Sequence, residues 1–550
     1  MNIFRINIMF FVVKNIKNLI PLAVCLVMTS LMVAQPTLPD EEIDVIKDFE
    51  ASLEESKKIN VTPELPELDT TSRQLTYALP SRTIQMQYLP PRLRPLAIKR
   101  DKVDPSYNGF VKLGYGTPNR PYAELAYNNT KDPKYDIGGH LKYHTANRKS
   151  LENQRFREIN GDLNGSYYFD QGFAVSGGLG YDFDEVHFYG YDNDTRSEPR
   201  EDVQQQFKTF AANAKFFNGV KTQGDIDYHA QFDLYSRTDN FAAKEFGFDF
   251  EVGATKWFNE LHPLTVILDA DFTVFKDGET QTLNNFGVRP SYTFHGDIFK
   301  AKVGFNLTSN DDNFKVFPDI EVSANIVGNQ LAAYLGADGG LYKNNFKNLT
   351  DYNPFLVSRI NPVNTDYYNF FAGVKGNLRV VDYQIQASYK SANNLALFVN
   401  NPLDTIRFDM LTDTVNIFNI EGTLEANPRK DLRVLLTLSQ NFFDTQDQEA
   451  AWHLPNLQFN AGAYYTMLRE KLVLSGELFI ENGVPYRTIG TNVEDSLGGL
   501  FDVNLGGNYK LTNRIGLFLN LNNVLNNKRE RWKGYETYGF NILGGVTAKF

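Results

Sequence analysis

The sequence predicts an all-β protein, a transmembrane antiparallel β-barrel of about 22 strands preceded by a short N-terminal arm in the periplasm. Three observations predict it. Apolar and polar residues alternate along many segments after Tyr107, aromatic residues make up 14% of the chain, and short turns alternate with long polar connections. In a barrel strand only every second residue faces lipid, which explains why the mean hydropathy of such a chain can be negative.

Residues 1–34 have the pattern of a signal peptide for export. An apolar run, Leu19 to Val33, ends at Ala34 and Gln35 before a proline, and we expect cleavage near Ala34. Three basic residues precede the run: Arg5, Lys14 and Lys17.

Two other interpretations of this segment stay open. The run could be a membrane anchor helix, although it is short for a span and contains Pro21. Cys25 could be a lipidation site, although Val24 is bulky for such a site and the apolar run continues past it. If the segment is removed, the mature chain has no thiol, which excludes disulfides, thiolate metal sites and cysteine nucleophiles.

Residues 35–106 differ in composition from the rest and predict a periplasmic arm. Asp40 can cap a short amphipathic helix, with Ile43, Ile46 and Phe49 on one side. Prolines follow at a density that disfavours a long helix or an internal strand. They are Pro63, Pro66, Pro80, Pro90, Pro91 and Pro95.

Residues 107–550 carry the two-residue period of barrel strands. The clearest examples are 225–235, 456–465, 501–511, 514–522 and the final segment. Their expected lipid-facing side chains include Phe232, Phe459, Leu505 and Leu519, and in the last strand Tyr538, Phe540, Val546 and Phe550. Most segments are long enough for the ~9–11 tilted residues that a span requires.

The connections between these segments are of two kinds. Short turns are expected at 169–172, 427–431, 468–471 and 510–514. Long polar connections are expected at 146–155, 190–202, 343–367, 443–455, 483–498 and 525–536. Strict alternation near the C-terminus and an even strand count place both ends of the barrel in the periplasm.

The C-terminal residues resemble those of TonB-dependent receptors. The similarity covers Phe518 to Lys528, Trp532 to Tyr535 and a last strand ending in Phe550. It implies a 22-stranded barrel in the outer membrane of a Gram-negative bacterium, with Phe550 as the aromatic that barrel insertion reads. Those receptors have a plug domain of well over a hundred residues, whereas 35–106 is shorter and proline-rich, so the chain resembles a relative without a recognisable plug. Residues 41–46 faintly resemble the segment that contacts TonB, but an amphipathic helix is the better interpretation.

No motif for catalysis, a cofactor or a metal stands out, and we do not expect an enzyme. His140 and His144 share a strand face but lie ~13 Å apart, too far to share a zinc ion. The clusters 192–194 and 310–313 could bind calcium, although solvated loop tips are the preferred interpretation. A net charge of −11 with no basic patch disfavours nucleic acid as a partner.

Two function classes remain. The first is transport or a channel, with the arm or the long loops acting as a partial plug, because a barrel of this size leaks if its lumen is empty. The second is a non-transporting scaffold of an outer-membrane complex, with the arm binding a periplasmic or lipoprotein partner. Arg529, Arg531 and Trp532 are expected either to meet lipopolysaccharide or a ligand, or to form part of an interface girdle beside the outer-membrane lipid.

Overall fold

The computed structural model describes residues 107–129, 132–310, 313–487 and 494–550. The expected signal peptide, 1–34, and the expected arm, 35–106, lie outside the described residues and stay predictions.

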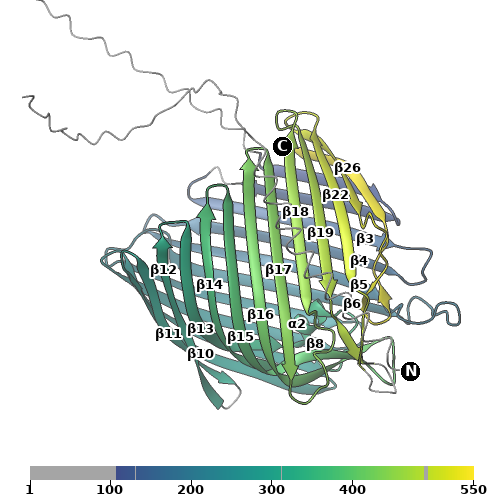
Figure 1. Cartoon of the computed structure of the whole chain (residues 1–550), viewed down its shortest axis with the longest axis horizontal. Coiled ribbons are helices and arrows are strands. Elements are labelled where there is room, and N and C mark those ends of the chain that lie inside the picture. The colour runs from purple at the N-terminus through teal and green to yellow at the C-terminus, as the bar shows by residue number, and fades with distance from the viewer. Residues whose placement is uncertain (1–106, 130–131, 311–312, 488–493) are drawn as a thin grey trace, which may run out of the picture. The chain divides into compact units, whose positions relative to one another are not determined.

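Twenty-two strands form one closed antiparallel sheet (Figure 1). Each pairs with its neighbours along the barrel. The first strand, β1 (Gly109–Gly116), pairs with both β2 (Arg120–Asn129) and the last strand, β26 (Asn541–Lys549), which closes the ring. The seam is tight, because a Cβ atom on Gly545 would lie 2.0 Å from the carbonyl oxygen of Leu113. The predicted fold class and strand number are confirmed.

The first half of the barrel consists of β1 Gly109–Gly116, β2 Arg120–Asn129, β3 Tyr135–Asn147, β4 Arg155–Tyr168, β5 Phe173–His187, β6 Gln204–Asn218, β7 Ile226–Asp239, β8 Lys244–Phe258, β9 His262–Asp277, β10 Glu279–His295 and β11 Phe299–Asn310. The second half consists of β12 Asn313–Val327, β13 Leu331–Asn344, β14 Val363–Leu378, β15 Val381–Asn400, β16 Phe408–Arg429, β17 Leu432–Thr445, β18 Leu457–Met467, β19 Leu472–Asn482, β22 Leu500–Lys510, β23 Ile515–Asn522 and β26 Asn541–Lys549. Within the described residues, two small hairpins and one helix lie in the connections: β20 Pro485–Arg487 with β21 Glu494–Ser496, β24 Glu530–Trp532 with β25 Tyr535–Glu536, and α2 Phe346–Tyr352.

The two ends of the barrel differ in the length of their connections. All four predicted short turns lie at the end where β26 finishes, and all six predicted long connections lie at the other end. Short turns face the periplasm and long loops face outward in outer-membrane barrels. The end with the long loops is therefore the extracellular end.

The outer face of the barrel is apolar. Phe232, Leu505 and Leu519 are each 43–49% exposed, as the two-residue period predicts, while neighbouring polar residues face the lumen. Such a continuous apolar surface is stable only in lipid, and the protein is an outer-membrane barrel. None of the helices in the described ranges is long and apolar enough to cross a membrane.

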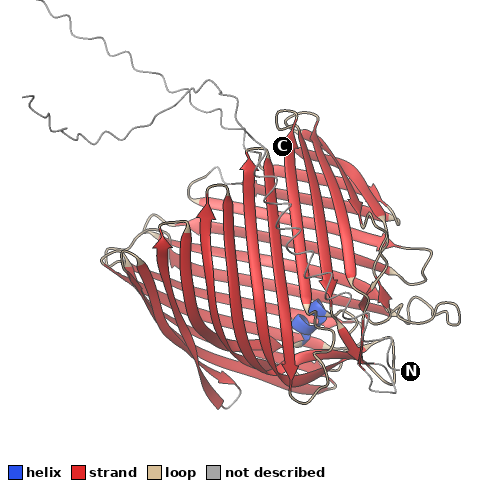
Figure 2. Ribbon diagram, in the orientation of Figure 1, coloured by secondary structure: helices blue, strands red, loops and turns tan. Residues whose placement is uncertain are grey.

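The long connection expected at 343–367 lies between Asn344 and Val363 and contains the short helix α2 (Figure 2). Asn345 caps α2 by accepting a hydrogen bond from the backbone N–H of Asn348 at 3.1 Å. One prediction at the extracellular end needs correction. The last strand starts at Asn541, so Tyr538 precedes it. Its ring packs edge-on against Phe156 instead of facing lipid.

Candidate functional site in the barrel lumen

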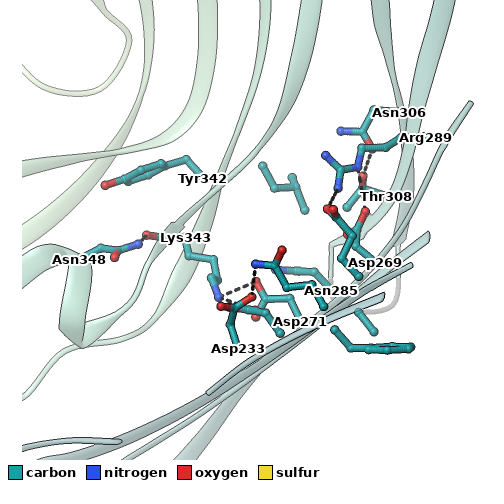
Figure 3. Close-up of a pocket in the computed structure, with 16 residues that line it drawn as sticks. Asp233, Asp269, Asp271, Asn285, Arg289, Asn306, Thr308, Tyr342, Lys343 and Asn348 are labelled. Atoms are coloured by element: carbon teal, nitrogen blue, oxygen red, sulfur yellow. Dashed lines mark hydrogen bonds and ion pairs between the residues drawn. The ribbon is translucent and has the colours of Figure 1, made fainter. Parts of the chain in front are cut away.

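A polar cavity of about 450 Å³ lies against the lumenal wall made by strands β7 to β11. Figure 3 shows the end of β13 and the start of α2 facing this wall, with Lys343 extended toward it. Five carboxylates line the cavity: Asp233, Asp249, Glu251, Asp269 and Asp271. The cavity is the candidate functional site.

The pairing of the strands places these carboxylates in two rows. Asp249 on β8 is directly opposite Asp233 on β7 and Asp271 on β9. One row further toward the periplasm, Glu251 is opposite Asp269. Opposed residues of this kind have Cβ atoms about 4.5–5.5 Å apart, a distance at which like charges destabilise a sheet. The wall therefore needs cations to balance it.

Lys343 supplies one of them from across the cavity. Its Nζ atom lies 2.5 Å from a carboxylate oxygen of Asp271 and 3.3 Å from one of Asp249 (Figure 3). The other carboxylate oxygen of Asp271 is buried and has no hydrogen-bond partner among the described residues. We call the row of Asp233, Asp249 and Asp271 the upper row and the row of Glu251 and Asp269 the lower row. The Lys343 ammonium thus pairs with two of the three carboxylates in the upper row.

Arg289 on β10 balances the lower row. Its guanidinium lies 2.6 Å from Glu251 and 2.9 Å from Asp269. His229 on β7 approaches Glu251 at 2.9 Å. Unlike Lys343, both of these groups belong to the same stretch of wall as the carboxylates, so they balance the lower row whatever the connection after β13 does.

Lys343 reaches this wall because the connection between β13 and β14 folds into the lumen. The Glu245 carboxylate on β8 accepts hydrogen bonds from the backbone N–H groups of Phe346 at 2.7 Å and Lys347 at 3.0 Å. Arg237 on β7 forms an ion pair with Asp351 of α2 at 2.9 Å. In sheet order β8 lies five strands from β13, about 24 Å of sheet, so this connection spans part of the bore.

Apolar contacts connect α2 with strands on two sides of the barrel. Phe346 packs against Phe207 on β6, with ring centres 6.0 Å apart. At the other end of α2, the ring of Tyr352 packs against that of Phe398 on β15, with ring centres 5.3 Å apart. Because β6 and β15 are nine strands apart in a ring of 22, these contacts bridge nearly opposite sides of the barrel.

Other extracellular connections pack onto this bridge. We call the connections 188–203, 345–362, 401–407, 446–456 and 523–540 together the loop cap. The rings of Phe355 and Tyr535 are stacked with centres 3.6 Å apart, and the hydroxyl of Tyr535 donates to the carbonyl of Ile406. Burial raises the pKa of Tyr535 well above its ordinary value and that of Tyr189 to about 12. The cap therefore has a water-poor core.

Trp532 lies in this core, which corrects one prediction. It is 5% exposed and stacks on His453 at 5.3 Å, so it belongs neither to an interface girdle nor to a lipopolysaccharide contact. Arg531 beside it forms an ion pair with the buried Glu481 at 3.2 Å. Sequence reasoning missed this role because the apolar residues of loop 525–536 follow no strand or helix period.

The other sequence candidates lie apart from the cavity. His140 and His144 face the lumen from β3 and meet different carboxylates, Glu124 and Glu158. In cluster 192–194 the Asp192 carboxylate accepts hydrogen bonds from its own loop, the backbone N–H of Asp194 and the hydroxyl of Thr195. Cluster 310–313 is only partly within the described residues. Across those residues, no group of three or more His, Cys, Asp or Glu side chains is placed to hold a metal ion.

Comparison with solved structures gives the same barrel. The FrpB iron transporter of Neisseria meningitidis, variant F3-3, matches with a TM-score of 0.65 at 10% identity over 82% of each chain. The pyoverdine receptor FpvA of Pseudomonas aeruginosa PAO1 matches at 0.62 and 11% identity, over 81% of this chain and 79% of that one. The copper transporter OprC matches at 0.60 and 12% identity, over 81% and 83%.

At these identities the likeness concerns the fold, and it agrees with the 22-stranded barrel that the C-terminal resemblance implies. No protein family model and no curated protein matches the sequence.

Proposed function

We propose that this outer-membrane barrel transports a small polar solute and that the structure is its closed state. The carrying observation is the polar cavity in the lumen, next to the apolar bridge and the loop cap at the extracellular end. A solute coming from outside would meet the cap first and the charged wall of β7 to β10 next. This order of layers suits controlled passage better than an open pore.

The nature of the cavity supports a polar solute. Its wall presents two rows of carboxylates with Arg289 and Lys343 as partners, so an apolar molecule would leave buried charges without hydration. The similar solved structures include proteins described as iron and copper transporters, which fits this class of function.

Residues 35–106 are part of the proposal as a periplasmic arm. We expect them either to occupy the lumen from the periplasmic side or to bind a periplasmic or lipoprotein partner, and we expect the extracellular loops to contact lipopolysaccharide. The transport proposal requires that the arm and the cap together keep the unliganded barrel closed.

Single-channel recording in planar bilayers tests this proposal. The intact protein is expected to be silent. A variant that lacks residues 36–100 and has 345–362 replaced by a short Gly-Asn turn is expected to conduct strongly, and the two single deletions show which segment closes the lumen. If the doubly deleted barrel folds but stays silent, while loss of the arm also removes a co-purifying protein, the protein is a scaffold and the transport proposal is wrong.

A further inference from the structure

We infer that residues 343–362, which we call the strap, form an autoinhibitory gate that the contact of Lys343 with Asp249 and Asp271 holds shut. The inference rests on the proposed transport function and adds to it the contact that keeps the lumen closed. The strap contains the end of β13, α2 and the connection to β14.

The two ends of the strap leave the sheet at one point. Asn344 at the end of β13 is paired with Val363 at the start of β14. The segment between them is therefore hinged on one side of the barrel and held on the other by its contacts with β7, β8 and β9. The middle of the strap is bridged to the barrel at Leu356, which forms an isolated bridge with Phe408 at the start of β16. Movement of the strap away from β7, β8 and β9 therefore breaks no pairing between two barrel strands.

The contacts of the strap with β7 and β8 are mainly polar. They are made by side chains of these strands and not by hydrogen bonds of the sheet. Glu245 holds the first two backbone N–H groups of α2, and Arg237 holds Asp351. The pairing of β7 with β8 and of β8 with β9 is unbroken beneath them. When the strap leaves the wall, water can replace these side-chain contacts. Breaking the pairing of strands in lipid would instead leave backbone groups without hydrogen-bond partners.

Lys343 is the contact on which closure depends most. Without it, Asp233, Asp249 and Asp271 form three carboxylates in adjacent strands, and the part of the chain that the structure describes places no other cation in their row, so the row favours hydration. With it, the ammonium lies between two of them at 3.3 and 2.5 Å. The charge of the wall thus draws the strap inward.

The apolar side of the strap stays covered when the wall contacts break. Phe355 stacks on Tyr535, and Tyr352 packs edge-on against Trp532 at 5.5 Å, both within the loop cap. Phe346 is the aromatic residue of the strap that packs on β6 and β9, through Phe207 and Phe275. Strap and cap can therefore leave the wall as one body, with Phe346 losing its partners there.

Thiol labelling in intact cells tests the gate directly. The chain has one cysteine, Cys25, which lies in the expected signal peptide, so Gln231→Cys introduces a single reporter in the cavity wall. In this background Lys343→Met is expected to raise the labelling rate by an externally added sulfonated maleimide about tenfold, and Lys343→Arg is expected to restore slow labelling.

Lys347→Met is the matched control, because the Lys347 ammonium pairs with Asp351 of its own helix at 2.9 Å and not with the wall carboxylates. Equal labelling rates in folded Lys343→Met and Lys347→Met proteins would overturn the inference. If Lys343→Met does not fold, Glu245→Gln replaces it with the same expected direction.

Conductance of the same substitutions in a protein that also lacks residues 36–100 separates the two proposals, because the arm can then no longer close the lumen. Faster labelling without conductance leaves the gate standing and contradicts transport. Conductance that rises in Lys343→Met without faster labelling leaves transport standing and places the closing contact elsewhere.

Discussion

The backbone N–H of Lys533 donates to Nε2 of His453 at 3.4 Å, and Nδ1 of the same ring lies 2.7 Å from the carbonyl oxygen of Phe398. One nitrogen must accept and the other must donate, so the folded cap holds the neutral ring with its proton on Nδ1. Burial lowers the pKa of His453 to about 4, and nearby Arg531 adds to this effect. His453 ties the connections 446–456 and 523–540 to β15.

Acid is therefore expected to loosen the loop cap. The folded-state pKa of His453 lies below the value of about 6.5 for an unfolded chain, so the stabilising effect is complete above pH 6.5. It falls by about 1.4 kcal/mol per pH unit as the pH drops from 6.5 toward 4. Limited proteolysis of the extracellular loops across this range measures the effect.

His453→Asn provides the control for this pH dependence. The backbone at position 453 has a φ of 59°, a left-handed conformation that Asn tolerates. The variant is expected to be less protected at every pH and to lose the slope between pH 6.5 and 4. A slope unchanged from that of the original protein would assign the titration to another group.

The stacked pair of Phe355 and Tyr535 is expected to stabilise the cap and not the barrel. Phe355→Ala removes a buried ring, a change that usually costs about 3–5 kcal/mol. Proteolysis of the cap loops should accelerate, while the temperature at which the barrel unfolds should change little. Phe418→Leu, on a lipid-facing ring, is the control and should leave the loops protected. A large fall in the melting temperature of the barrel would contradict this separation.

An added charge is expected to destabilise the barrel much more on the lipid-facing side of β23 than on its lumenal side. Leu519 faces lipid near the middle of the strand, so Leu519→Arg should destabilise the barrel by about 2–4 kcal/mol. The neighbouring Asn520 faces the lumen, where Asn520→Arg should cost much less. Urea unfolding in lipid vesicles compares the two variants. Equal losses would mean that the assigned faces of β23 are wrong.

The predicted processing of the N-terminus has a simple test. The mature protein in isolated outer membranes is expected to begin at Gln35, after cleavage at Ala34. Intact-mass measurement and N-terminal sequencing distinguish this from an uncleaved anchor, which keeps residues 1–34, and from a lipoprotein, which begins at a lipidated Cys25.

The sequence by itself was sufficient to determine the barrel, because a strand between lipid and water shows its two environments in a two-residue period. Leu519 and Asn520 could be assigned to opposite faces without any coordinates, and turns such as 468–471 were found at the predicted positions. Strand number and the position of the C-terminus followed from the same local pattern.

The closed lumen depends on contacts that no local pattern reveals. Glu245 and Phe346 are 101 residues apart in the chain, and Lys343 meets Asp271 across the cavity. The carboxylates of β7 to β9 become neighbours only through strand register, and Trp532 becomes buried only because several loops converge. The tertiary structure alone decided these pairings, since each one depends on where the closed ring of strands places distant segments.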